Sequence, residues 1–257
     1  MSVHVIHINQ ERCIGCGQCV KDCPAGNIAL KEKTASMIEA KCVLCGHCAA
    51  ICPCHAIAIS GYAEEAVEQT VIPRLDSKEV LDVIRFRRTI RQFQNKAVDA
   101  AVIAQILEAG RLTHTAKNLQ DVSYVILDRS IKDMERLAVG LFRKLKPFAN
   151  LFSSMVKRTV IHDHFFFFHA PIAIIILAKE EINGSLAAAN MEFAAEANGL
   201  GVLYSGFFTM AVNHSRRLRK AMQIPRGKKA VTTLVLGYPQ VRYRRSAQRE
   251  DLDARYL

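Results

Sequence analysis

Residues 13–24 read CIGCGQCVKDCP and residues 42–53 read CVLCGHCAAICP. Both stretches follow the pattern C-x2-C-x2-C-x3-C-P, and together they hold eight of the nine cysteines of this 257-residue chain. Short loops let the first three thiolates of a run close over one face of a cubane iron–sulfur cluster, whereas the fourth points toward a neighbouring cluster. The repeat therefore predicts two 4Fe–4S clusters. We expect one cluster on Cys13, Cys16, Cys19 and Cys52, and the other on Cys42, Cys45, Cys48 and Cys23.

These motifs make residues 1 to about 60 resemble a bacterial two-cluster ferredoxin. Zinc is the alternative ligand, because paired C-x2-C units also bind it. However, a zinc site has no use for the third and fourth cysteines of each run, nor for the proline that follows each. The ninth cysteine, Cys54, comes just after the second run, and we expect a small buried neighbour of a cluster and not a ligand.

Length and charge both divide the chain. Nearly two hundred residues follow the cysteine motifs, which is enough to bury a separate core. Residues 1–70 carry a net charge of −2 and residues 71–257 carry +13. The basic residues are dispersed and Trp is absent, so we predict anionic cofactors, substrates or an acidic protein partner and no nucleic acid. The predicted division is a ferredoxin domain over 1–62, a linker over 63–76 and a second domain over 77–257.

The first residues give an expectation about the compartment. Met1-Ser2-Val3-His4 begins neither a basic nor an apolar leader, so we expect a cytoplasmic protein with reduced thiols. The apolar stretch 165–178 is too short to span a bilayer and is interrupted by His169 and Pro171. Its second half, 172–178, is instead predicted to be a fully buried central strand.

The second domain alternates helical and strand patterns, which predicts an α+β protein with a three-layer α/β/α domain around a central sheet. No G-x-G-x-x-G fingerprint or P-loop is present, so a nicotinamide site of Rossmann type is not predicted. Strands are predicted over 122–127, 172–178 and 230–236. Helices are predicted over 76–88, with one apolar side, over 99–109, with apolar residues facing inward, and over 131–146, 185–198 and 213–222.

Residues 87–93 read RRTIRQF and offer three guanidinium groups and a hydroxyl within five residues. Such a group can saturate a phosphate with charge-assisted hydrogen bonds, although a basic helix end is also typical of a solvated surface. Three further segments follow in order: HTAKNLQ at 114–120, GLGVLYSGF at 199–207 and LGYP at 236–239. Arginines 242, 244, 245 and 249 come after them.

Taken together, the segments from about Leu81 to about Arg249 resemble the FMN-dependent nitroreductase superfamily. The loop at 114–122 departs from the family pattern by His for Pro, by Thr115-Ala116 for two serines and by Asp121-Val122 for Pro-Trp, so Ala116 cannot contribute through its side chain. The resemblance implies N–H groups of Ser205 and Gly206 near flavin N5, where they favour the reduced anion. The other FMN contacts that it implies are Arg87, Arg88, Thr89, Arg91, Thr115, Ala116, Asn118, Gln120, Arg244 and Arg245.

The resemblance also implies a homodimer with active sites at its interface, and an oxidoreductase of nitroreductase type. We predict electron transfer from two 4Fe–4S clusters through FMN to a small organic acceptor such as a nitroaromatic, a quinone or an activated alkene. No side chain stands out as a general acid, so the catalytic residues stay unknown. The donor is a ferredoxin or NAD(P)H. The alternatives are an electron-transfer module that serves another protein, or a flavin-modifying or dehalogenating branch of the superfamily.

Overall fold

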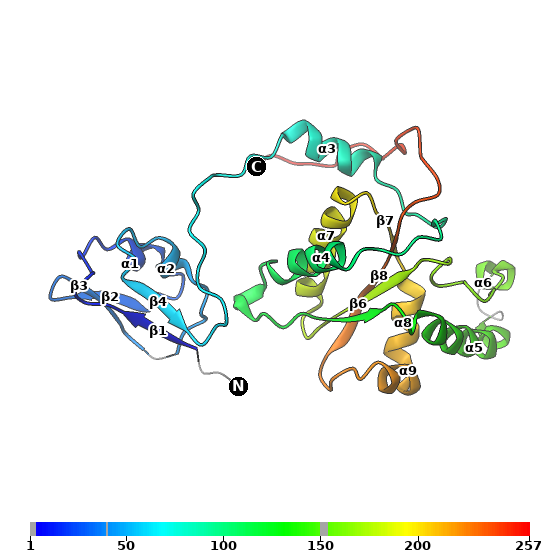
Figure 1. Cartoon of the computed structure of the whole chain (residues 1–257), viewed down its shortest axis with the longest axis horizontal. Helices are drawn as coiled ribbons and strands as arrows, with labels where there is room; N and C mark the ends of the chain where they lie inside the picture. Colours follow the sequence, from blue (N-terminus) through cyan, green and yellow to red (C-terminus); the bar gives the residue numbers. More distant parts are fainter. Residues whose placement is uncertain (1–3, 40, 150–153) are drawn as a thin grey trace. The chain divides into compact units, whose positions relative to one another are not determined.

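The computed structural model describes residues 4–39, 41–149 and 154–257 (Figure 1). The chain forms two compact units. The first comprises Met1–Arg74 together with Ala116–Leu119, and the second comprises Leu75–Thr115 together with Gln120–Leu257. No helix in these ranges combines the length and the apolar character needed to cross a membrane.

The first unit is built from two similar halves. Strand β1 (Val5–Ile8) pairs antiparallel with β4 (Ile57–Ser60), and β2 (Ile28–Lys31) pairs with β3 (Thr34–Met37). Each cysteine run enters a short helix, α1 (Gln18–Asp22) or α2 (His47–Ala50), through a left-handed glycine. Those glycines are Gly17 (φ 73°) and Gly46 (φ 78°), a backbone conformation that other residues rarely adopt. The buried Cys19 and Cys48 therefore face the small core with Ile28 and Ile57.

The second unit is organised around a four-stranded antiparallel sheet in the order β5-β6-β8-β7. Its strands are β5 (Ser123–Leu127), β6 (Ile172–Ala178), β7 (Gly201–Tyr204) and β8 (Lys229–Gly237). All seven residues of β6 are buried, which confirms the prediction of a central strand at 172–178. Its β-branched run has apolar neighbours on both faces, as a strand covered on both sides requires.

Helices cover both faces of this sheet, so the predicted three-layer arrangement is confirmed (Figure 1). Ile174 and Ile176 of β6 point into one core, together with α4 (Ala100–Arg111) and α7 (Glu181–Ala197). Ile175 and Leu177 point into the other. That second core is closed by α5 (Ile131–Ala149), α8 (Gly206–His214) and α9 (Arg216–Ala221), and α6 (Ser154–Arg158) follows α5.

One helix prediction is confirmed and another needs correction. Helix α3 (Ser77–Phe86) is capped as expected, because Asp76 Oδ1 accepts a hydrogen bond from the Glu79 N–H at 2.9 Å. Its apolar residues do not face a core, however: Leu81 is 57% exposed and Ile84 is 51% exposed. The prediction of a single helix at 213–222 is wrong. Helix α8 ends before Ser215, and the side chain of Ser215 caps the start of a new helix, α9.

Candidate metal centre and candidate active site

The first unit contains two cavities lined by cysteines. One is lined by Cys23 of the first run and by three cysteines of the second. The other is lined by Cys52 of the second run and by three cysteines of the first. The fold therefore brings together the sets that the spacing predicts, Cys42, Cys45, Cys48 with Cys23 and Cys13, Cys16, Cys19 with Cys52.

Backbone N–H groups donate hydrogen bonds to the sulfurs of the first and the fourth cysteine of each run. The N–H groups of Asn27 and Ala56 donate to Cys23 Sγ and Cys52 Sγ, both at 3.3 Å. The N–H groups of Ala35 and Leu44 donate to Cys13 Sγ and Cys42 Sγ at the same distance. Donors aimed at sulfur stabilise thiolate charge and help to set the potential of a bound cluster. The residues present thus fit a 4Fe–4S cluster in each cavity.

The spacing of the thiols differs from that of a single-ion site. Among the residues that the structure describes, no three His, Cys, Asp or Glu side chains converge as the ligands of one metal ion would. Each set of four thiols instead surrounds a cavity, which is the arrangement that a multi-iron cluster needs. Burial raises the pKa of Cys19 and of Cys48, and neighbouring thiols add to the effect. Cys54, which is partly exposed, lines the cavity that holds Cys52.

In the second unit, the arginine segment runs along the edge of the sheet. The Ile90 N–H donates to the Val202 carbonyl of β7 at 3.1 Å, and Phe93 bridges to Pro239 beyond β8. Gly201 permits this approach, because a Cβ there would lie 2.4 Å from a side-chain carbon of Ile90. Two predicted segments, 87–93 and 199–207, are therefore held side by side.

Arg87 and Arg88 carry buried guanidinium nitrogens. Arg87 Nη1 lies 2.8 Å from Glu192 Oε1 of α7, so these two buried groups form an ion pair. Arg88 Nη2 is buried without a partner in the described part of the chain. A buried donor without an acceptor is costly, and an anionic oxygen would satisfy it. The Nη2 of Arg88 therefore fits a phosphate oxygen. Thr89 beside them is half-buried and Arg91 is exposed.

Glu192 links the arginines to the end of β7. The hydroxyl of Tyr204 donates to Glu192 Oε2 and to the Ala188 carbonyl, both at 3.2 Å. Burial raises the pKa of Tyr204, and Glu192 raises it further. Burial likewise raises the pKa of Glu196, one helical turn after Glu192, and repulsion from Glu192 adds to it. Sequence reasoning missed this acidic pair, although its i, i+4 spacing places both carboxylates on one side of α7.

Ser205 and Gly206 follow Tyr204 at the start of α8. The Ser205 N–H donates to the Thr233 carbonyl at 2.8 Å, and Ser205 Oγ donates to the Phe166 carbonyl at 3.0 Å. Ser205 is thus held by protein on both sides. Gly206 is exposed and begins the helix, where backbone N–H groups are free of intrahelical partners.

The loop at 115–120 is divided between the two units. Thr115 Oγ1 accepts a hydrogen bond from the Gln120 N–H at 2.9 Å within the second unit. Residues 116–119 belong to the first unit, where Asn118 Nδ2 donates to the carbonyls of Val43 (3.1 Å) and Leu44 (2.8 Å). Ala116 begins this short 3-10 turn. The remaining predicted residues, Arg244 and Arg245, are exposed on the irregular segment after β8.

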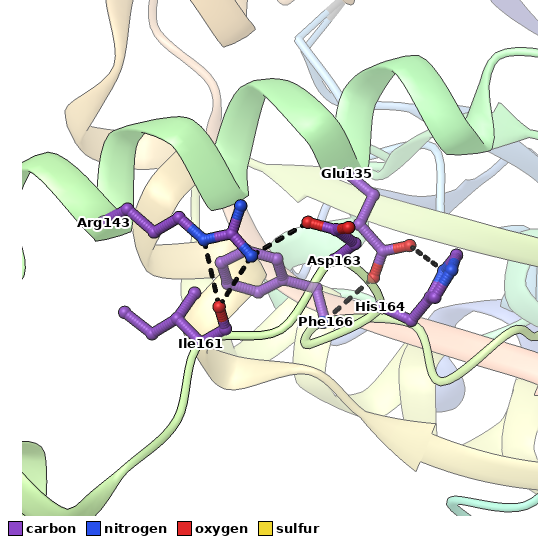
Figure 2. A network of polar contacts seen from close by, with 6 residues as sticks. All are labelled: Glu135, Arg143, Ile161, Asp163, His164 and Phe166. Carbon is purple, nitrogen blue, oxygen red and sulfur yellow. Dashed lines mark hydrogen bonds and ion pairs between the residues drawn. The ribbon is translucent and has the colours of Figure 1, made fainter.

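A further polar network lies beneath the start of α8 and was not foreseen. Glu135 of α5 is 4% exposed and accepts hydrogen bonds from the backbone N–H groups of Phe166 and Phe167. Figure 2 shows Glu135 beside Phe166 and His164. Farther along α5, Arg143 binds the Ile161 carbonyl and Asp163 (Figure 2). Burial raises the pKa of Glu135, although the N–H groups that it accepts lower it in part. Its position four residues after Ile131, on the apolar side of α5, is the signal that could have identified it.

Comparisons with known proteins agree with this division of the chain. The family described as "Nitroreductase family" matches residues 84–238, and the domain described as "4Fe-4S dicluster domain" matches residues 5–53. The chain is 25% identical, over 65% of its length and 80% of the other protein, to an NADH dehydrogenase/NAD(P)H nitroreductase of Methanothermobacter thermautotrophicus. It is 24% identical, over 64% of its length and 66% of the other protein, to an NADPH-dependent oxidoreductase of Staphylococcus saprophyticus.

Solved structures share the fold of the second unit. An FMN-bound nitroreductase from Bacteroides fragilis aligns with a TM-score of 0.57 at 18% identity, over 69% of this chain and 99% of that one. An FMN-bound nitroreductase from Desulfitobacterium hafniense aligns with a TM-score of 0.58 at 16% identity, over 70% of this chain and 98% of that one. At these identities the likeness concerns the fold.

Proposed function

This chain belongs to the nitroreductase family, and on that premise we propose that it passes electrons from two 4Fe–4S clusters to FMN and on to a small organic acceptor. The predicted class, an FMN-dependent oxidoreductase of nitroreductase type, is confirmed at the level of the family. The acceptor that we propose is planar and electron-poor, such as a nitroaromatic, a quinone or an activated alkene. When bound, FMN supplies a store for two electrons between one-electron clusters and a two-electron acceptor.

One observation carries the proposal for FMN: the buried Nη2 of Arg88 lacks an acceptor in the described part of the chain, next to Arg87 and beside β7, whose end leads to Gly206. We propose that these two arginines hold the phosphate and that the Gly206 N–H donates to flavin N5. The FMN bound in the two structural neighbours supports this choice. The further contacts that we propose are Thr89, Arg91, Thr115, Ala116, Asn118, Gln120, Ser205, Arg244 and Arg245.

We also propose a homodimer. Helix α3 exposes Leu81, Ile84 and Phe86, each at 50% or more, and the last residues expose Leu252 (90%) and Tyr256 (98%). Large apolar side chains gathered on the surface favour association. In a two-fold dimer the same patch of each subunit meets at the interface, so a second copy of the chain would bury these apolar side chains. Sedimentation of the full chain tests this point.

The experiment for electron transfer uses the wild-type full chain and two variants. We would compare wild type with the double variant Cys16→Ser/Cys45→Ser, which removes one proposed ligand from each cluster. Cys54→Ser is the matched control, because Cys54 lines a cavity without belonging to either set of four. Reduction of bound FMN by reduced ferredoxin should collapse in the double variant and persist in the control, while dithionite still reduces the flavin in both. Equal rates of FMN reduction by ferredoxin in wild type and both variants would show that electrons do not pass through the clusters.

A second candidate, an electron-transfer module for another protein, is favoured by the surface of α9. Arg216, Arg217 and Lys220 are exposed there, while Leu218 anchors the helix in the core. An exposed basic helix suits an acidic carrier protein. Turnover with small acceptors that does not depend on an added protein would favour the enzyme; reduction of a carrier alone would favour the module.

A further inference from the structure

Glu135 is a buried carboxylate outside both proposed cofactor sites. Its Oε1 accepts hydrogen bonds from the N–H groups of Phe166 at 3.0 Å and Phe167 at 2.8 Å. Its Oε2 lies 3.4 Å from Nδ1 of His164 (Figure 2). Burying an ionised carboxylate is costly unless it is paired and hydrogen-bonded. The two amides and the imidazole therefore make a complete set of partners that fixes the backbone at 164–167.

The segment that Glu135 holds is conformationally constrained. Phe168 and His169 have φ values of 51° and 63°, in the left-handed region that non-glycine residues avoid. The rings of Phe166 and Phe167 are 1% exposed and contact Phe208 of α8 with centroids 5.7 and 4.5 Å apart. Such strain persists only where the surroundings determine the conformation. The hydrogen bonds to Glu135 and the packing of the aromatic rings together hold the segment in this conformation.

This segment in turn fixes Ser205. The Phe166 carbonyl accepts a hydrogen bond from Ser205 Oγ at 3.0 Å, and Ser205 is 6% exposed. On its other side, the Ser205 N–H donates to the Thr233 carbonyl, and its own carbonyl accepts from Thr209 Oγ1 at 3.1 Å. The next residue is Gly206. A single peptide unit and one side-chain hydrogen bond thus separate Glu135 from the residue that directs the Gly206 N–H.

We infer that Glu135 is a positioning residue for the flavin site. Through the Phe166 carbonyl and Ser205, Glu135 orients the Gly206 N–H and so favours the reduced cofactor. The inference rests on the proposed function. A hydrogen bond weakens steeply when its donor turns away from the acceptor, so a loosened turn would stabilise reduced flavin less. The negative charge of Glu135 acts in the opposite direction, because it disfavours added electrons nearby. Position and charge therefore predict shifts of opposite sign.

The test measures the midpoint potential of bound FMN by anaerobic spectroelectrochemical titration of the full chain. Glu135→Ala removes the acceptor of both N–H groups, whereas Glu135→Gln retains an oxygen acceptor and removes the charge. Val139→Ala is the matched control, because Val139 is a buried residue one turn along α5 that packs in the same core. We expect the alanine variant to disfavour reduced flavin by about tenfold or more, which is about 30 mV toward negative potential for a two-electron couple. Glu135→Gln, which keeps the acceptor and loses only the charge, should move the potential in the positive direction, and Val139→Ala should lose thermal stability without a shift.

Each other outcome overturns the inference. A shift to positive potential in both Glu135 variants would assign the effect to charge, and an unshifted Glu135→Ala would leave Glu135 a structural residue only. If Glu135→Ala does not fold, Ser205→Ala breaks the same chain one link later and must move the potential in the negative direction. A wild-type chain that binds no FMN would overturn the proposed function together with the inference. FMN-loaded wild type with unshifted variants would overturn the inference alone.

Discussion

The two units build their candidate sites in different ways. In the first unit, each set of four thiols comes from two stretches of twelve residues, and the loops between the cysteines are too short to place them elsewhere. In the second unit, most residues proposed for the flavin lie on separate segments, after α3, before β5, at the start of α8 and after β8. A hydrogen bond to β7 holds the first of these segments at the sheet edge. A local motif thus specifies its own geometry, whereas a distributed site depends on the whole domain.

The largest expected effect breaks the local site. Full-length protein prepared without oxygen should contain about eight iron and eight sulfide per chain. Because the fourth cysteine of each run lines the cavity of the other, Cys23→Ser should damage the cluster of the second run, and Cys52→Ser that of the first. Iron and sulfide analysis with electron paramagnetic resonance would assign the loss. Samples that hold zinc and no sulfide would contradict the reading of the first unit.

The distributed site should lose its cofactor when its charges are removed. Charge-assisted hydrogen bonds contribute about 1.5–3 kcal/mol each, so Arg87→Ala/Arg91→Ala should weaken FMN binding at least about a hundredfold and leave the iron content intact. The first substitution also leaves Glu192 buried without its partner, which destabilises the fold by itself.

A companion variant separates those two effects on FMN binding. Adding Glu192→Gln to the double variant removes the unpaired charge, so it should restore thermal stability without restoring FMN. Flavin content after gel filtration and calorimetric titration with FMN would measure both. Full retention of FMN by either variant would show that the phosphate is held elsewhere.

The same contrast explains what the sequence could and could not predict. The crossed cysteine sets and the buried strand β6 follow from patterns within a few residues, and the structure has both. The exposure of the apolar side of α3 could not be predicted, because an amphipathic pattern does not say which surface that side packs against. The bonds from Asn118 to carbonyls more than seventy residues away, and the role of Glu135 beneath Ser205, arise only from tertiary packing.

A smaller effect on the free energy of unfolding comes from Asp121, which links the sheet to the start of α7, and this effect depends on pH. Asp121 is 8% exposed; burial alone would raise its pKa, but the Glu180 N–H, the Asn183 side chain and the Lys179 N–H outweigh burial and lower it. Because the folded pKa lies below the unfolded value, this stabilisation is present above about pH 3.8 and is lost as the pH falls through the folded pKa. Asp121→Asn should therefore lose about 2 kcal/mol at neutral pH and less in acid. Urea unfolding at several pH values measures the difference, and a pH-independent loss would contradict the mechanism.

The smallest expected effect compares two helix caps that are alike locally but differ in packing. Asp76 accepts from the Glu79 N–H at 2.9 Å at the start of α3, and Asp99 accepts from the Ala101 N–H at 2.8 Å at the start of α4. Loss of such a cap costs about 1 kcal/mol of helix stability. Helix α4 is anchored by the fully buried Ile106, so Asp99→Ala should lower the global stability by about that amount. Helix α3 has no buried residue within the chain, so Asp76→Ala should speed amide hydrogen exchange in α3 and leave the midpoint of global unfolding unchanged. If the proposed dimer buries α3, the Asp76 variant should also dissociate at lower dilution than wild type, whereas a global loss equal to that of Asp99→Ala would show that α3 is held within its own chain.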